Sequence, residues 1–260
     1  MKSISKQQKF MILVLLGVIL IASTSLIEPI AQDQQYHQFA DQRSYLSIPN
    51  TLNVASNLLF LVIGLAGLFM LCLRRSLVII EPLFPAYIVF FTALVVIAPG
   101  SAYYHWVPDN QSLVWDRLPM TLAFMSFFAI ILGERISLRF ARLAFLPLLF
   151  AGFSSIVYWS LSETAGSGDL RPYALVQFLP MLMIPLILLM FSPKFSRDHD
   201  LWILLACYLV AKILETLDGQ ILQALAVISG HSLKHIVASI GCLVYLRYLQ
   251  RRKSLSSGNA

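Results

Sequence analysis

The sequence predicts an all-α protein built as a polytopic bundle of transmembrane helices, and three observations support this fold class. Of its 260 residues, 58% are hydrophobic and 12% are charged, whereas a soluble domain carries about 25% charged residues. The mean hydropathy is +0.76. The apolar residues also stand in long blocks, and a helix that crosses a bilayer needs about 20 mostly apolar residues.

Eight segments are long and apolar enough to be expected as spans. In chain order they cover residues 10–30, 53–73, 84–105, 117–134, 143–161, 172–191, 201–219 and 231–249. Only short loops lie between them, so we expect no separate soluble domain. The first segment follows a lysine-containing N-terminus and is either a retained anchor or a cleaved signal peptide. The chain then divides into an N-terminal transmembrane helix (1–30), a seven-helix domain (31–250) and a cytoplasmic tail (251–260).

Lysine and arginine gather on one side of the expected membrane, and this bias sets the orientation of a protein with short loops. That side receives 14 of the 19 basic residues: Lys2, Lys6, Lys9, Arg74, Arg75, Arg135, Arg139, Arg142, Lys194, Arg197, Arg247, Arg251, Arg252 and Lys253. The other side receives Arg43, Arg117 and Arg171 among acidic residues. We therefore predict that both termini are cytoplasmic, and the short loops and simple basic N-terminus indicate a bacterial inner membrane. The orientation in the membrane then accounts for the net charge of +6, so this charge does not indicate a nucleic-acid partner.

Ionisable side chains inside a span are costly unless paired or hydrated, so each is a candidate functional group. The third span ends in Ser101-Ala-Tyr-Tyr-His105, whose spacing places Ser101 and His105 on one helical face. Pro99-Gly100 before them indicates a bend or a close backbone approach. Asp116 opens the fourth span. Taken alone, such a histidine is more often structural, and the serine and aspartate are ordinary helix caps.

A second histidine motif opens the eighth span, which begins Gly230-His231-Ser-Leu-Lys-His235. Two imidazoles one turn apart form the geometry of a helical zinc motif, although a hydrogen-bonded pair has the same spacing. Because the third span runs outward and the eighth runs inward, His105, His231 and His235 are expected at one depth. Three protein ligands leave one zinc position open for water, as in catalytic sites. Asp116 would be the general base and Ser101 an oxyanion donor.

A third polar cluster lies in the seventh span, where Lys212, Glu215 and Asp218 are spaced three apart. It is either an internal ion-pair network or a set of groups that orient the zinc-binding histidines. His37 and His199 are expected to be solvated loop residues. Four polar side chains at the start of the second span either face the same cavity or bridge helices: Asn50, Asn53, Ser56 and Asn57.

With these motifs in hand, the chain resembles the alkaline ceramidase family, within a wider group of seven-helix membrane hydrolases that includes the adiponectin-receptor-like proteins. The resemblance covers roughly residues 41–250. It rests on Asn53-Val-Ala-Ser56-Asn57, Gly100-Ser101-Ala-Tyr-Tyr-His105, Trp115-Asp116-Arg-Leu-Pro-Met120 and Gly230-His231-Ser-Leu-Lys-His235. It implies that His105, His231 and His235 bind zinc and that Ser101 and Asp116 serve catalysis.

Two features depart from that family. Its eukaryotic members hold calcium in an acidic segment before the span that matches Asn53–Asn57, whereas this chain has Asn50 where a glutamate is typical. Calcium binding near Asp41 and Asn50 therefore stays in doubt. The additional first span also makes eight helices against the family's seven.

The sequence as a whole favours a zinc-dependent membrane hydrolase that cleaves the amide bond of ceramide or a related N-acyl lipid. The lipid would reach the site from the outer leaflet. Two other functions stay open: a receptor-like protein with a structural zinc, and a transporter or proton channel. A transporter would need polar groups across the full depth of the membrane, and the inner halves of the spans are almost wholly apolar.

Overall fold

The computed structural model describes residues 4–73 and 76–255, and within these ranges it contains helices and no β-strand. The elements are α1 (Lys6–Thr24), η1 (Gln34–His37), α2 (Thr51–Ala55), α3 (Leu58–Cys72), η2 (Glu81–Leu83), α4 (Phe84–Trp106), α5 (Asn110–Arg135), α6 (Leu138–Thr164), α7 (Arg171–Met190), α8 (His199–Thr216), α9 (Asp218–Leu225) and α10 (Gly230–Arg251). The all-α prediction is confirmed.

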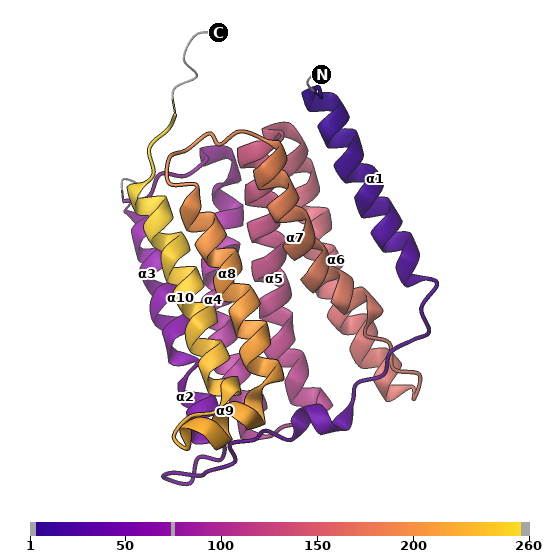
Figure 1. Cartoon of the computed structure of the whole chain (residues 1–260), viewed down its shortest axis with the longest axis vertical. Helices are drawn as coiled ribbons and strands as arrows, with labels where there is room; N and C mark the ends of the chain where they lie inside the picture. Colours follow the sequence, from indigo (N-terminus) through magenta and orange to yellow (C-terminus); the bar gives the residue numbers. More distant parts are fainter. Residues whose placement is uncertain (1–3, 74–75, 256–260) are drawn as a thin grey trace.

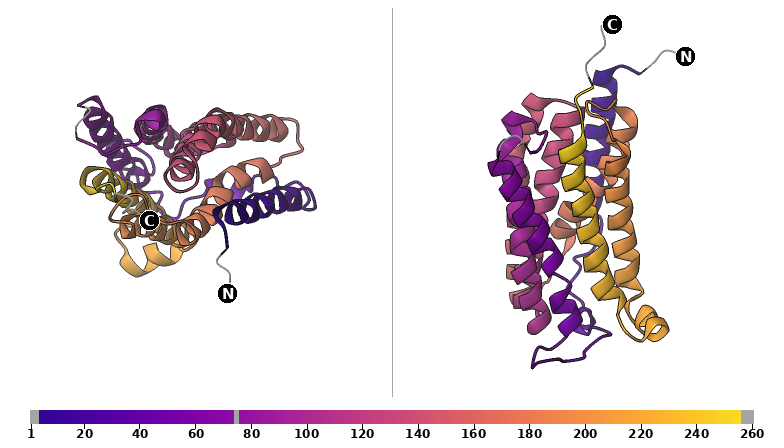
Figure 2. Two further views of the ribbon diagram at one scale, coloured as in Figure 1. Left: turned by 90° about the horizontal axis from the view of Figure 1, so that it is seen from above. Right: turned by 90° about the vertical axis from the view of Figure 1, so that its left-hand side faces the viewer.

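The long helices stand side by side as an up-and-down bundle (Figure 1). α5 lies at its centre, packed against α4, α6 and α7, and α10 packs mainly against α8. α1 stands at the edge beside α7 and buries only Leu13 among its described residues (Figures 1 and 2). Both ends of the described chain lie at the same end of the bundle.

Each of the eight predicted spans coincides with a helix, but fewer helices meet the requirements for crossing a membrane. Within the described residues, six are long and apolar enough: α1, α2 with α3, η2 with α4, α5, α6 and α7. α9 and α10 qualify together as a bent pair, with 102° between them. α8 does not qualify, and it carries Asp200, Lys212 and Glu215. The structure therefore supports a multi-pass helical bundle without fixing the count at eight.

The outward surface of the bundle is apolar, as lipid contact requires. On α6, for example, Leu146 and Phe150 are 70% and 72% exposed. An exposed apolar surface of this extent marks contact with a membrane or another protein, and the length of the helices favours the membrane.

The basic residues assigned to one side lie at the end of the bundle that holds both termini, as far as the structure describes them. Lys9 Nζ donates to the Met190 carbonyl at 2.7 Å, and Arg135 pairs with Asp198. Lys2, Arg74 and Arg75 fall outside the described residues.

The chain just after α10 belongs to the bundle and is not a free tail. Arg252 is buried, pairs with the buried Glu134 and lies 3.9 Å from the centre of the Phe195 ring. Its Nε donates to the Val78 carbonyl at 2.7 Å. The residues directly after α10 therefore pack against the bundle.

Candidate metal centre

Three buried histidines meet at the end of the bundle opposite the termini. His105 comes from the last turn of α4, and His231 and His235 come from the first turns of α10. Their ligand nitrogens all lie within 4.8 Å of one another. The ring centres are 4.8, 5.0 and 5.1 Å apart. The prediction that these three side chains converge is confirmed.

The ring nitrogens fit a bound metal ion. His105 Nδ1 and His231 Nε2 are buried and have no hydrogen-bond partner among the described residues, an arrangement that costs free energy unless something binds them. His235 Nδ1 lies 2.8 Å from the Ser56 hydroxyl, which leaves its Nε2 for a metal. Three imidazoles suit an ion such as Zn²⁺ and leave a coordination position open.

Side chains from α2 and the segment before it hold the histidine-bearing helices in place. Asn50 Nδ2 donates to the His105 carbonyl at 2.8 Å. The Ser232 hydroxyl donates to Asn53 Oδ1 at 2.6 Å. Together with the Ser56 contact, these bonds connect α2 to both α4 and α10. Of the two alternatives, bridging between helices holds for Asn50 and Asn53, and Ser56 reaches a histidine of the cluster. Asn57 donates instead to the Asn53 carbonyl at 2.8 Å.

Asp218 has a different place from the one predicted. It begins α9 and does not continue α8, because the helix breaks at Leu217. Its Oδ1 accepts the backbone N–H of His231 at 2.7 Å, and its Oδ2 accepts that of Ala40 at 3.0 Å. Asp218 thus fixes the start of α10 through backbone hydrogen bonds. The side-chain contact to an imidazole comes from Ser56, whose hydroxyl lies beside His235 Nδ1.

A close crossing of α4 and α5 brings Ser101 to Asp116. A Cβ atom at Gly100 would lie 2.2 Å from the Trp115 carbonyl oxygen, so a side chain there would force the helices apart. Pro119 stands four residues after Trp115 and has no N–H, which leaves that carbonyl without its helical partner. Glycine on one helix and proline on the other therefore permit the crossing.

Asp116 lies within α5 and is not its cap. Asp109 is the N-cap, and its carboxylate accepts the Ser112 N–H at 2.7 Å. The buried Ser101 follows Gly100, whose Cβ position would lie 3.7 Å from the Asp116 backbone nitrogen, so Ser101 and Asp116 stand close together where the two helices cross. The reading of Asp116 as an ordinary cap is wrong, and the structure places a serine–aspartate pair one helical turn from His105.

Glu215 forms the centre of an ion-pair network beside the histidines. It pairs with Lys212 on its own helix and with Lys234 on α10, which stands between His231 and His235 in the chain. The Tyr36 hydroxyl donates to Glu215 Oε1 at 3.3 Å. The predicted pairing of Lys212 with Glu215 is confirmed. Their third partner is Lys234, whose position inside the His-x-x-x-His motif was the available signal.

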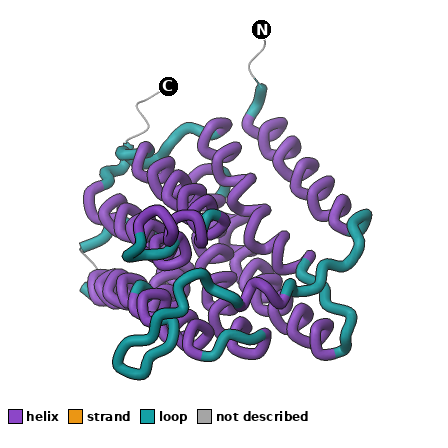
Figure 3. The backbone as a smooth tube through the Cα atoms, turned by 60° about the horizontal axis from the view of Figure 1, so that its bottom comes forward, coloured by secondary structure: helices purple, strands orange, loops and turns teal. Residues whose placement is uncertain are grey.

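The segment between α1 and α2 crosses this end of the bundle (Figure 3), and its Phe39 covers two of the histidines. Phe39 is buried there, with its ring centre 4.6 Å from that of His105 and 4.8 Å from that of His231. His37 anchors the segment, since its ring nitrogens lie 3.0 Å from the Tyr104 hydroxyl and 2.9 Å from Asn110 Oδ1. The prediction of a solvated His37 is wrong, whereas His199 is exposed as predicted.

The two residues considered for calcium have protein partners. Arg43 binds both carboxylate oxygens of Asp41, at 2.7 and 2.6 Å, and lowers the pKa of that carboxyl. Its Nη2 also donates to the Val227 carbonyl at 2.7 Å. Asn50 directs its amide at the His105 carbonyl. A guanidinium therefore stands against the carboxylate that a calcium ion would use.

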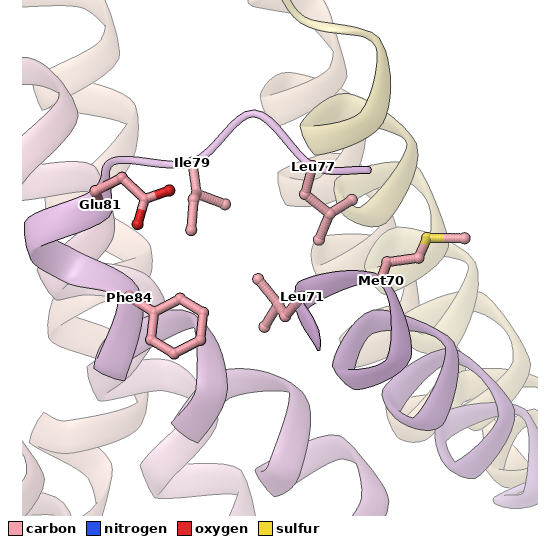
Figure 4. A pocket seen from close by; sticks show the side chains of 6 residues that line it. All are labelled: Met70, Leu71, Leu77, Ile79, Glu81 and Phe84. Atoms are coloured by element: carbon pink, nitrogen blue, oxygen red, sulfur yellow. The ribbon is translucent and has the colours of Figure 1, made fainter. Parts of the chain in front are cut away.

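Two cavities among the described residues lie away from the histidines of the site. One, of about 120 Å³, lies near the opposite end and is lined by Met70, Leu71, Leu77, Ile79, Glu81 and Phe84 (Figure 4). The other, of about 620 Å³, is an apolar groove between α4 and α5 that reaches Gly100 and Trp115. No family model, curated protein or solved structure matched the chain.

Proposed function

We propose that the protein is a zinc-dependent intramembrane hydrolase, with a seven-helix core like that of the alkaline ceramidases, that cleaves the amide bond of ceramide or a related N-acyl lipid. One observation carries the proposal: a buried cluster of three imidazoles, two of them with unpartnered nitrogens, stands beside a serine–aspartate pair. A receptor-like protein with a purely structural zinc ion would not need the serine and the aspartate.

Each of the five site residues has a distinct task in this mechanism. His105, His231 and His235 would hold the ion, which when bound supplies Lewis acidity and a water of lowered pKa. Asp116 accepts a proton from the attacking water and delivers it to the leaving amine nitrogen. The Ser101 hydroxyl donates a hydrogen bond to the oxygen that becomes negative as the carbonyl carbon is attacked.

The membrane setting supports a lipid substrate. The site lies at the end of a bundle whose outward surface is apolar, so a lipid amide approaches from the membrane with its acyl chain in the hydrocarbon. Because most basic residues are assigned to the end with the termini, that end would face the cytoplasm and the end with the histidines would face the periplasm.

A structural-zinc receptor is the second candidate, and the covering segment favours it. Phe39 packs on two of the histidines, and no histidine of the cluster is more than 7% exposed. A catalytic site under this cover requires the segment to move or the substrate to enter from the side.

The experiment that separates enzyme from receptor is the substitution Asp116→Asn. Asparagine keeps the shape of the side chain but does not take up a proton at neutral pH. Hydrolysis of a fluorescent N-acyl sphingoid lipid should fall by about 10²- to 10⁴-fold, while zinc content stays at the wild-type level. The variant His231→Ala should lose zinc and activity together. Wild-type turnover by Asp116→Asn would disprove the mechanism, and full zinc with no turnover in the wild type would favour the receptor.

A further inference from the structure

Two lysines from different helices share one carboxylate next to the metal centre. Lys212 of α8 binds Glu215 Oε2, and Lys234 of α10 binds Glu215 Oε1. The Lys212 side chain is 36% exposed, and those of Lys234 and Glu215 are 16% exposed. Two ammonium groups on one carboxylate leave a net positive charge at a position that a molecule can reach.

Most of the donors on the two ammonium groups have no protein acceptor. A lysine ammonium has three N–H donors. Within the described structure Lys212 and Lys234 each donate one hydrogen bond, in both cases to Glu215. Two donors on each lysine are left for water or a ligand. Buried Arg117, which follows Asp116, adds a third positive charge, and its guanidinium packs against the rings of Tyr36, Trp159 and Tyr173.

The charges around the site balance only until a metal ion binds. Three cations, Lys212, Lys234 and Arg117, stand with three carboxylates, Asp116, Glu215 and Asp218. A divalent ion on the histidines would therefore add two positive charges, or one once its bound water has lost a proton. Uncompensated charge in a low-dielectric site is costly, and a ligand anion removes the cost.

We propose that Lys212 and Lys234 bind an anionic oxygen group of the substrate head, so that a lipid amide bearing a phosphate or carboxylate is a better substrate than neutral ceramide. The proposal rests on the proposed function, since it names the substrate class for the same site. Lys234 lies on α10 between His231 and His235, and its ammonium binds Glu215 Oε1, so we expect the anionic group to lie beside the proposed metal ion. A phosphate monoester carries about −1.5 to −2 charge at pH 7, which matches the excess.

Three substrates with the same acyl chain test the head-group preference: neutral ceramide, ceramide 1-phosphate and an N-acyl amino acid. Wild type should hydrolyse at least one of the two anionic amides with a kcat/KM about tenfold or more above that for ceramide. In Lys212→Met this ratio should fall by about ten- to a hundredfold, and in Lys212→Arg it should be largely restored. The control Arg139→Gln, an exposed basic residue at the opposite end, should leave the ratio unchanged. A wild-type preference for ceramide overturns the inference.

A binding measurement separates failure of this inference from failure of the proposed function. Zinc-loaded protein is titrated with hexadecyl phosphate, palmitate and hexadecanol in detergent. Tighter binding of an anionic probe, weakened about tenfold in Lys212→Met, supports the anion site even if no amide is hydrolysed. Equal binding of the charged and neutral probes by wild type overturns it, even if ceramide is a good substrate.

Discussion

At the scale of single residues, two glycines decide where the reactive groups lie. Gly100 precedes Ser101, and its Cα lies against the Trp115 carbonyl. Gly230 precedes His231, and a Cβ atom there would be 2.1 Å from the Leu214 carbonyl oxygen. In both places a helix that carries a site residue touches the backbone of its neighbour, so a methyl group would move the site residue itself.

Gly100→Ala should therefore impair catalysis without removing the metal. The added methyl group separates α4 from α5, and with them Ser101 from Asp116, while His105 stays on the same helix. A displacement of about 1 Å costs about 10²-fold in rate, so hydrolysis of the lipid amide should fall by about that factor. Gly17→Ala is the matched control, because its Cβ would have no neighbour within 4 Å. Unimpaired hydrolysis by Gly100→Ala would show that the crossing is not needed for catalysis.

Ser56→Ala tests how His235 is oriented. Its hydroxyl lies 2.8 Å from His235 Nδ1, and partners of this kind change metal affinity by about 10- to 100-fold. Zinc affinity, measured by competition with a chromophoric chelator, should weaken by that amount. Ser154→Ala, which loses only a hydrogen bond of 3.4 Å to the Ala151 carbonyl of its own helix, should bind zinc normally. Equal zinc affinities in the two variants would mean that Ser56 does not support His235.

At the scale of elements, the segment between α1 and α2 connects the edge helix to the site. Arg171 of α7 donates to the Ile27 carbonyl at 2.5 Å and pairs with Asp169 at 2.8 Å. The Leu170 N–H donates to the Ile30 carbonyl at 2.8 Å. The α6–α7 loop therefore holds the start of the segment whose later part, at Phe39, covers the histidines.

The pairing of Asp169 with Arg171 should make part of the stability depend on pH. Hydrogen bonds from Arg171 lower the pKa of Asp169 from 3.8 to about 2. Because the folded value is the lower one, the stabilisation is complete above pH 3.8 and is lost as the pH falls toward 2. Asp169→Asn should reduce the unfolding free energy by about 1 kcal/mol at pH 6. In detergent, the difference in melting temperature from wild type should narrow between pH 4 and pH 2.5. A difference that stays constant over this interval would contradict the assignment.

The positions of the helices could be predicted from the sequence, whereas only some of the side-chain contacts could. Spans of about 20 apolar residues are a local property, so every predicted span became a helix. α1 ends at Thr24 and not at residue 30, because Glu28 and Pro29 do not continue an apolar helix. The histidines could be placed together because their helices run in opposite directions. The contacts of Asp218 with Ala40 and His231 depend on how separate elements pack, so the spacing along one helix does not encode them.

At the scale of the whole molecule, the two ends of the described chain lie together and the site lies at the far end. With 14 of the 19 basic residues assigned to the end with the termini, a reporter active only in the periplasm should be silent when fused after Ala260. The same reporter inserted at Gly166, in the α6–α7 loop, should be active. The reverse pattern would place the metal centre at the cytoplasmic face.

The origin of the histidines has a consequence for biogenesis. His105 leaves the ribosome with α4, whereas His231 and His235 leave it with α10, the last helix of the bundle. The chain therefore presents a single imidazole of the three until α10 is made, and the histidine cluster is complete only once α10 has packed into the bundle. If the cluster holds a metal ion as proposed, the ion binds late, and a chain truncated before α10 lacks two of its three ligands.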